Sequence, residues 1–175
     1  ARLRNLLLRR PKIGINLDFT GPTAAKETAL LLKSAQDYIK YINDTEGGVK
    51  GTKLEILWAD SGYNIQRMLS NYARFKEAGT SIVMVQVSQE AFVLKSVAER
   101  DHMPVFTHAV DANAYSPPGW IYTAGGGSTP EFFAVFLKWL KDNWKETRAP
   151  RIAVIGWDNT LGRAPQAVSK LIEET

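Results

Sequence analysis

The stretch Lys12-Ile13-Gly14-Ile15-Asn16-Leu17-Asp18-Phe19-Thr20-Gly21-Pro22 decides the fold. Its apolar residues alternate with small or polar ones as far as Asp18, which is typical of a short strand. A polar turn ending in Gly-Pro follows, and the next stretch has the apolar spacing of a long helix. Because more strand–helix pairs follow, we expect a doubly wound parallel sheet with helices on both faces. The predicted fold class is α/β.

The rest of the chain is expected to alternate between strands and helices, with right-handed crossovers. The expected strands cover 53–60, 81–87, 104–107, 120–123 and 151–157. The expected helices cover 24–43, 65–78, 88–100, 128–144 and 165–174, and residues 111–119 are expected to form a loop.

The run Gly125-Gly126-Gly127 separates this pattern into two parts. It precedes a helix start made of a hydroxyl cap, an early proline and an acid, Ser128 to Glu131. We interpret the glycines as a hinge or crossover between lobes. The alternative, a phosphate-binding loop, lacks the lysine of a P-loop and the spacing of a dinucleotide site.

The domain prediction follows from this boundary. Residues 1–11 are expected to be a basic tail or the remnant of a leader or tag, and 12–124 a first ligand-binding lobe. Residues 125–175 would be the crossover and the beginning of a second lobe. One strand between two helices cannot close a core of its own, so we expect this second lobe to be incomplete, with its remainder in a longer protein.

The net charge of +4 comes from the N-terminal tail. Four of the 22 Lys and Arg residues lie within 1–11, and the other 18 match the 18 Asp and Glu residues. The charge therefore gives no reason to expect a nucleic-acid partner. A basic helix that touches a membrane or a partner is the alternative interpretation of the tail. No apolar run approaches the ~20 residues that cross a bilayer.

Ligands of such sheets bind beyond the carboxyl ends of the strands, where the winding direction reverses. Phe19 and Thr20 would lie at the rim of that crevice. Ser88, followed by Gln89, comes directly after the third strand and starts a helix, whose free N–H groups attract anions such as a carboxylate. The alternative is that Ser88 only caps the helix. If the first and third strands are neighbours, Ser88 and Thr20 face each other.

The turn after the fourth strand would reach the crevice from the other side. It contains His108, Ala109 and Asp111. The Asp111 carboxylate or the Ala109 carbonyl could receive a ligand ammonium group, whereas a surface Asx turn is the alternative for Asp111.

The sequence contains no pattern that is typical of a catalytic site, a metal site or a cofactor site. The chain has no cysteine, so disulfides, thiolate chemistry and sulfur-bound metals are excluded. His102 and His108 lie at opposite ends of one short strand, which makes a shared metal site unfavourable. No Ser–His–Asp or paired-carboxylate arrangement is evident. We predict a protein that is not an enzyme and that has no cofactor.

A series of short motifs resembles the type I periplasmic solute-binding proteins of ABC transporters, in the branch that binds leucine, isoleucine and valine. The series is Thr20-Gly21-Pro22, Ile42-Asn43, Gly47-Gly48-Val49 and Gly51-Thr52-Lys53-Leu54-Glu55, with Asp60 after it. The resemblance extends over nearly all of 12–175. It implies a flavodoxin-like strand order 2-1-3-4-5 in the first lobe, with the start of a second α/β lobe.

The resemblance also implies functional roles. A helix-start hydroxyl that binds the ligand carboxylate corresponds to Ser88, and the carbonyl and hydroxyl of the next turn correspond to Ala109 and Asp111. Asp111 departs from the usual threonine and favours a cationic group. Leu161 stands where the family often has tyrosine, so one aromatic wall is missing.

The function implied is capture of a small amino-acid-like ligand, an amide or a related acid, which is passed to a membrane permease. The location implied is periplasmic or extracellular, with a lipid anchor as one form. Two alternatives remain: a ligand-sensing domain of the same fold in a regulator or receptor, and a nucleotide-using flavodoxin-like enzyme.

Overall fold

The computed structural model describes residues 11–24, 26–107, 112–124 and 128–156. The strands are β1 (Lys12–Leu17), β2 (Glu55–Asp60), β3 (Thr80–Val85), β4 (Val105–Thr107) and β5 (Ile121–Thr123). The helices are α2 (Lys26–Thr45), α3 (Ile65–Glu77), α4 (Ser88–Asp101), α5 (Ala112–Tyr115) and α6 (Thr129–Asn143).

The five strands form one parallel sheet in the order β2-β1-β3-β4-β5. Both the α/β prediction and the predicted strand order are therefore confirmed. From β1 the chain moves outward to β2, and it then returns to the other side of β1 to form β3. The winding reverses between β1 and β3, and this places the switch point at their carboxyl ends.

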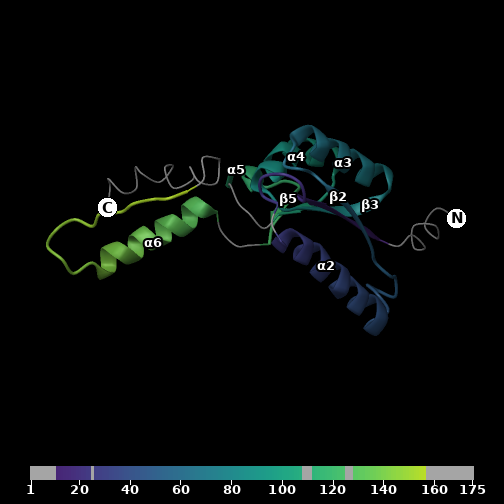
Figure 1. Ribbon diagram of the computed structural model, residues 1–175, viewed down its shortest axis with the longest axis horizontal. Coiled ribbons are helices and arrows are strands. Elements are labelled where there is room, and N and C mark those ends of the chain that lie inside the picture. Colours follow the sequence, from purple (N-terminus) through teal and green to yellow (C-terminus); the bar gives the residue numbers. More distant parts are fainter. Residues whose placement is uncertain (1–10, 25, 108–111, 125–127, 157–175) are drawn as a thin grey trace.

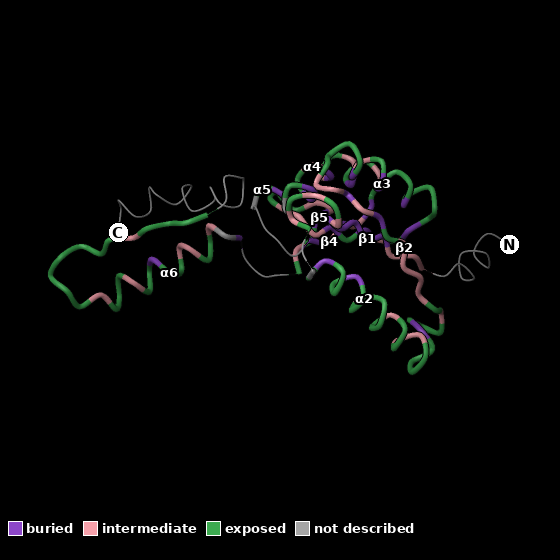
Figure 2. Tube along the Cα trace, viewed as in Figure 1, coloured by how far each residue is buried: buried purple, intermediate pink, exposed green. Residues whose placement is uncertain are grey.

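Helices lie on both faces of the sheet (Figure 1), with α3 and α4 on one face and α2 on the other. The larger core lies under α3 and α4, where Met68, Val83, Leu94 and Val105 are buried. A smaller core lies under α2, around Ile15, Leu17 and Leu32. Figure 2 shows buried and half-buried residues along most of the sheet, whereas the helices have long exposed stretches.

On the face of the sheet that packs against α2, the helix leaves part of the strands β3 and β5 exposed. A row of residues in register crosses all five strands on this face: Trp58, Ile15, Met84, Phe106 and Tyr122. Within the row Met84 is 41% exposed and Tyr122 is 43% exposed. The Phe106 and Tyr122 rings stack with centroids 5.4 Å apart. We call the part formed by Met84, Phe106 and Tyr122 the open apolar strip.

Gly14 permits the close approach of α3 to β1. A Cβ atom at this position would lie 2.8 Å from two ring carbons of Phe75, which is itself buried. We expect Gly14→Ala to lower the free energy of unfolding by about 1–3 kcal/mol through overpacking. Urea denaturation measures this difference.

The double variant Gly14→Ala with Phe75→Leu is the control for that experiment. Leucine removes the ring that the new methyl group meets, so the two changes should be non-additive and the second should recover part of the loss. A Gly14→Ala chain as stable as the parent would contradict the packing argument.

The ends of two helices have clear local causes. Gly47 and Gly48, which follow α2 after Glu46, have positive φ values of 72° and 90°. Ser128 and Glu131 form a capping box at the start of α6, each side chain accepting a backbone N–H of the other residue.

Two local predictions are wrong. The loop expected over 111–119 contains the short helix α5. Residues 151–156 form neither helix nor strand, although we expected a strand from Arg151. A strand needs a hydrogen-bonded neighbour, and the described part of the chain pairs none with this segment; Ile155 is fully exposed. Trp157 and the helix expected over 165–174 lie outside the described residues.

No helix in the described ranges has the length and hydropathy needed to cross a membrane.

Candidate functional site

The carboxyl ends of the strands bring three loops of the described chain to one edge of the sheet. They follow β1, β2 and β3, and they carry Phe19, Thr20 and the start of α4. Buried polar side chains lie beneath these loops, which is unusual for the interior of an α/β sheet. This polar edge is the candidate site.

Asp18 shapes the loop after β1 from below. Its side chain is completely buried. One carboxylate oxygen accepts the backbone N–H of Gly21 at 2.6 Å. The other accepts the backbone N–H of Thr23 at 2.9 Å and the Thr23 hydroxyl at 2.5 Å. The loop is thus closed around one carboxylate, with backbone donors that satisfy its charge.

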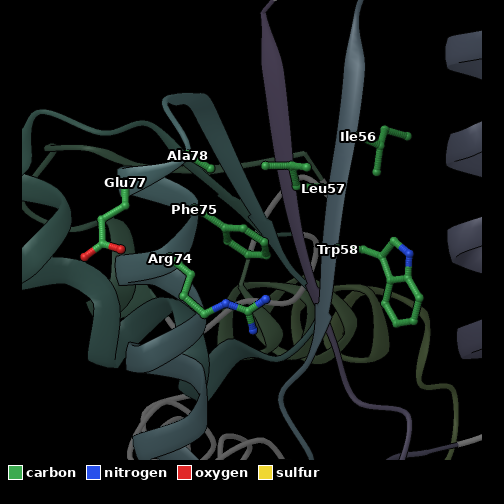
Figure 3. Close-up of a pocket in the computed structure, with 7 residues that line it drawn as sticks. All are labelled: Ile56, Leu57, Trp58, Arg74, Phe75, Glu77 and Ala78. Carbon is green, nitrogen blue, oxygen red and sulfur yellow. The ribbon is translucent and has the colours of Figure 1, made fainter.

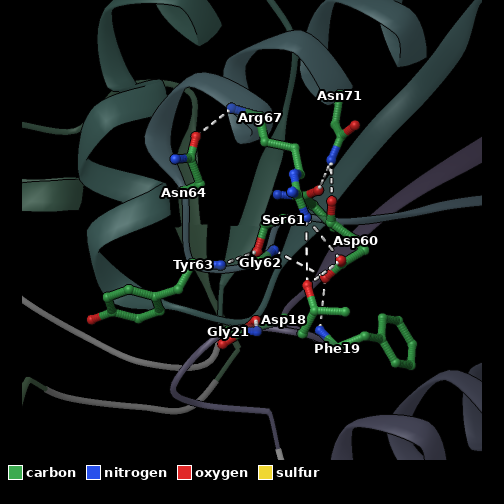
Figure 4. Close-up of polar contacts among 12 residues, drawn as sticks. Asp18, Phe19, Gly21, Asp60, Ser61, Gly62, Tyr63, Asn64, Arg67 and Asn71 are labelled. Carbon is green, nitrogen blue, oxygen red and sulfur yellow. Dashed lines mark hydrogen bonds and ion pairs between the residues drawn. The ribbon is translucent and has the colours of Figure 1, made fainter.

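Asp60, the last residue of β2, ties the first two loops together (Figure 4). It accepts the Phe19 backbone N–H at 2.8 Å, the Gly62 backbone N–H at 2.9 Å and the Thr20 hydroxyl at 2.6 Å. Arg67 of α3 adds an ion pair at 3.1 Å. Burial acts to raise the pKa of Asp60, but these hydrogen bonds and the Arg67 charge lower it overall.

The Asp60 contacts decide where Thr20 and Phe19 lie. β1 and β3 are neighbours, as expected, but the Thr20 hydroxyl is bonded to Asp60 on the β2 side of the edge. The Phe19 ring packs against Trp58 with centroids 5.2 Å apart, within the α2-side core. Contact of either residue with a ligand remains a prediction.

α4 begins beside the switch point without a side-chain cap. Its N-cap position is Val87, which makes no side-chain hydrogen bond, whereas Asn64 caps α3 and Ser128 caps α6. Ser88 is the first residue of the helix, one position after the N-cap. Gln89 follows and is exposed. The first turn of α4 therefore presents backbone N–H groups that no cap side chain satisfies.

A buried polar cluster lies below this helix start, formed by Asn16, Asp18, Ser61, Asn71 and Glu90. Each member is at most 6% exposed. The Asn71 amide donates at 2.9 Å to the Asn16 side-chain oxygen and at 2.9 Å to the Asp60 carbonyl. The Asn16 side-chain nitrogen and both Glu90 carboxylate oxygens have no hydrogen-bond partner among the described residues.

Burial raises the pKa of Glu90 to about 7, and the Asp18 charge adds to the increase, while the Ser61 hydroxyl, the Val87 backbone and the Asn16 side chain counteract it. Sequence reasoning did not find Glu90 or Asn71. Only their positions in the sequence could have identified them. Glu90 lies in the first turn of a helix after a buried strand, and Asn71 lies in the apolar stripe of α3.

The other predicted site residues, His108, Ala109, Asp111 and Leu161, lie outside the described residues, as do Gly125 to Gly127. The part of the chain that the structure describes contains no cluster of three or more His, Asp or Glu side chains that could hold a metal ion.

Two larger hollows border the sheet, and the second reaches Gln86, Thr107 and Ala124 at the carboxyl ends of β3, β4 and β5. One, of about 690 Å³, straddles the edge strand β2 beside the end of α3. Figure 3 shows Trp58 and Ile56 on one side of that strand and Phe75 on the other. The second, of about 230 Å³, lies between α2 and the sheet and is lined mainly by apolar side chains such as Leu31 and Phe106.

A family model described as "Periplasmic binding protein" matches residues 11–172. No curated protein matches the chain. A solved fatty acid ABC transporter substrate-binding protein from Thermomonospora curvata is similar, with a TM-score of 0.79 and 21% identity over 95% of this chain and 42% of that chain.

Two further solved structures are similar. One is a solute-binding protein of an ABC transporter from Rhodopseudomonas palustris BisB5 in complex with 3,4-dihydroxybenzoic acid, with a TM-score of 0.74 and 16% identity over 93% of this chain and 43% of that chain. The other is a branched-chain amino acid transporter substrate-binding protein from Streptococcus pneumoniae in complex with isoleucine, with a TM-score of 0.64 and 18% identity over 77% of this chain and 39% of that chain. The chain spans about two fifths of the length of these proteins.

Proposed function

The chain belongs to the periplasmic binding protein family, and on this premise we propose that it is part of an extracytoplasmic solute-binding protein that captures a small organic acid for an ABC importer. Residues 12–124 form the first ligand-binding lobe, and 125–175 form the crossover and the beginning of the second. The preferred ligand is amino-acid-like. The protein binds without turning over its ligand.

The uncapped start of α4 is the observation that carries this proposal. Backbone N–H groups and the helix dipole favour a negative charge there, beside the switch point of the sheet. The three similar structures support the choice of a carboxylate, because a fatty acid, dihydroxybenzoic acid and isoleucine all contain one. The carboxylate is the one group that all three share.

The remaining predicted residues complete the site in this proposal. Ser88 and Gln89 hold the carboxylate from α4. Ala109 and Asp111 receive a cationic group, beside His108. Phe19 and Thr20 lie at the rim, and Leu161 contributes from the second lobe. Gly125 to Gly127 form the hinge.

The mechanism is a shift between open and closed arrangements of the two lobes. A ligand that contacts both lobes stabilises the closed form, and a membrane permease then recognises that form. The part of the binding site that the first lobe contributes is held in place before the ligand binds. Asp18 and Asp60 fix the loop after β1 because they accept hydrogen bonds from its backbone N–H and hydroxyl groups.

Calorimetry of the full-length protein tests the proposal with isoleucine, 3,4-dihydroxybenzoate and a fatty acid as ligands. We expect at least one to bind, and Ser88→Ala to weaken that binding roughly tenfold, equivalent to about 1.4 kcal/mol. Ser96→Ala is the matched control, since Ser96 is exposed two turns later on the same helix. Equal affinities of the Ser88 and Ser96 variants would count against the carboxylate position. Absence of binding to any organic acid would remove the function.

A further inference from the structure

Glu90 is a buried acid that the proposed function leaves unused. It lies in the first turn of α4, two residues after Ser88, and it is only 6% exposed. Its backbone N–H donates to the Val87 carbonyl at 3.0 Å, so the residue is fixed at the helix start. Its two carboxylate oxygens make no hydrogen bond of good geometry in the described part of the chain, although Ser61, Asn16 and the Val87 backbone lie near enough to offset part of the cost of burial. An unpaired carboxylate in this position is costly, whereas a neutral acid is less so.

Burial and one neighbouring charge favour the neutral form of Glu90. Asp18, which directly follows β1, brings a negative charge, whereas the Asn16 side chain acts in the opposite direction. From the loop after β2 come the Ser61 hydroxyl and Tyr63, which lines a small hollow of about 10 Å³ with Glu90. Such a hollow has room for about one water molecule.

The neighbouring elements add little positive charge. Asn71 of α3 contributes an amide that is bonded to Asn16 and the Asp60 carbonyl. The guanidinium of Arg67, also on α3, is paired with Asp60. Val87 and Gln89 complete the lining from the β3–α4 side without a charge.

We propose that Glu90 is a positioning residue that couples the binding of a carboxylate ligand at the start of α4 to the uptake of one proton. The inference rests on the proposed function. A ligand anion adds a negative charge to a region that already holds Asp18, so it binds better when Glu90 is neutral. An ionised Glu90 would itself occupy the positive end of the helix dipole and compete with the ligand.

The coupling predicts a pH dependence with a definite sign. Above neutral pH the free protein must take up a proton to bind the anion, so affinity falls as the pH rises. For a carboxylate ligand whose own charge is constant between pH 6 and 8, we expect about a tenfold loss of affinity over that range. Calorimetry in phosphate and in Tris, which differ in ionisation enthalpy, should give an uptake of about half a proton at pH 7.

Glu90→Gln is the variant that tests the residue, because glutamine keeps the size of the side chain and cannot titrate. With isoleucine, 3,4-dihydroxybenzoate and a fatty acid as probes, we expect its affinity to be the same at pH 6 and pH 8, with no proton uptake. Glu27→Gln is the matched control, since Glu27 lies in the first turn of α2 and is exposed. That control should keep the pH dependence of the parent. A ligand-free ¹³C NMR titration of the Glu90 carboxyl should show a midpoint near 7.

The outcomes separate the two proposals. If a carboxylate binds equally tightly from pH 6 to 8 without proton uptake, the function stands and the coupling is overturned. The coupling is also overturned if Glu90→Gln keeps the pH dependence of the parent. If none of the three carboxylates binds at any pH, the proposed function fails and the coupling falls with it.

Discussion

Replacing Asp18 with alanine is expected to lower the free energy of unfolding by about 3 kcal/mol, a large effect for one polar side chain. The carboxylate is completely buried and accepts two backbone N–H groups and one hydroxyl. Alanine removes these acceptors and leaves the amides of Gly21 and Thr23 without their partner. Because the donors are backbone groups, they cannot turn away without a change in the path of the loop.

Urea denaturation of the chain, followed by circular dichroism, measures this effect. Asp37→Ala is the matched control, because Asp37 is exposed on α2 and forms an ion pair with Lys33 one turn away. That change should cost less than about 0.5 kcal/mol. Asp18→Asn should fall between the two, since asparagine keeps one acceptor oxygen. Equal midpoints for Asp18→Ala and Asp37→Ala would show that the loop does not depend on the carboxylate.

The second large effect is a change of stability with pH that Glu90→Gln should abolish. The pKa of Glu90 is raised from 4.5 to about 7 in the folded chain. Between these values the folded chain holds a proton that the unfolded chain releases. The contribution of Glu90 to the free energy of unfolding is therefore greatest below pH 4.5. It decreases as the pH rises and is lost above about pH 7. The total change corresponds to about 3 kcal/mol.

Urea denaturation at pH 5 and pH 8 tests this prediction. Relative to the parent, Glu90→Gln should be more stable at pH 8 by up to about 3 kcal/mol, and much of that advantage should be absent at pH 5. The exposed Glu27→Gln variant corrects for other groups that titrate in this range. A Glu90→Gln difference that is the same at both pH values would mean that Glu90 does not titrate there.

The sequence predicted the sheet well because local and long-range signals agree there. The alternation from Ile13 to Asp18 and the Ser128 cap each correspond to an observed feature. The family resemblance drawn from the motifs after Pro11 is also confirmed, since the family model matches residues 11–172.

The two wrong secondary-structure predictions have physical causes that the local sequence pattern does not reveal. Residues 151–156 have strand composition, but strand formation depends on a partner elsewhere in space. α5 is a single short turn of helix with no apolar period to reveal it.

The candidate site was only partly predictable, for a related reason. Position after a strand identifies Ser88 and Thr20 as residues near the edge, but it does not give the direction of a side chain. The Thr20 hydroxyl is bonded to Asp60, from a strand 40 residues later in the chain. The burial of Glu90 depends on packing between α4, β1 and the loop after β2. Charged residues are usually exposed, so composition alone argued against a buried acid.

The open apolar strip of Met84, Phe106 and Tyr122 has a practical consequence for all of these measurements. Environment-sensitive dyes report unfolding because their fluorescence increases when they bind exposed hydrophobic surface. This strip is such a surface while the protein is still folded. Dye-based melting curves of the chain should start from a high background fluorescence and show little rise. Circular dichroism or intrinsic tryptophan emission is therefore the appropriate readout.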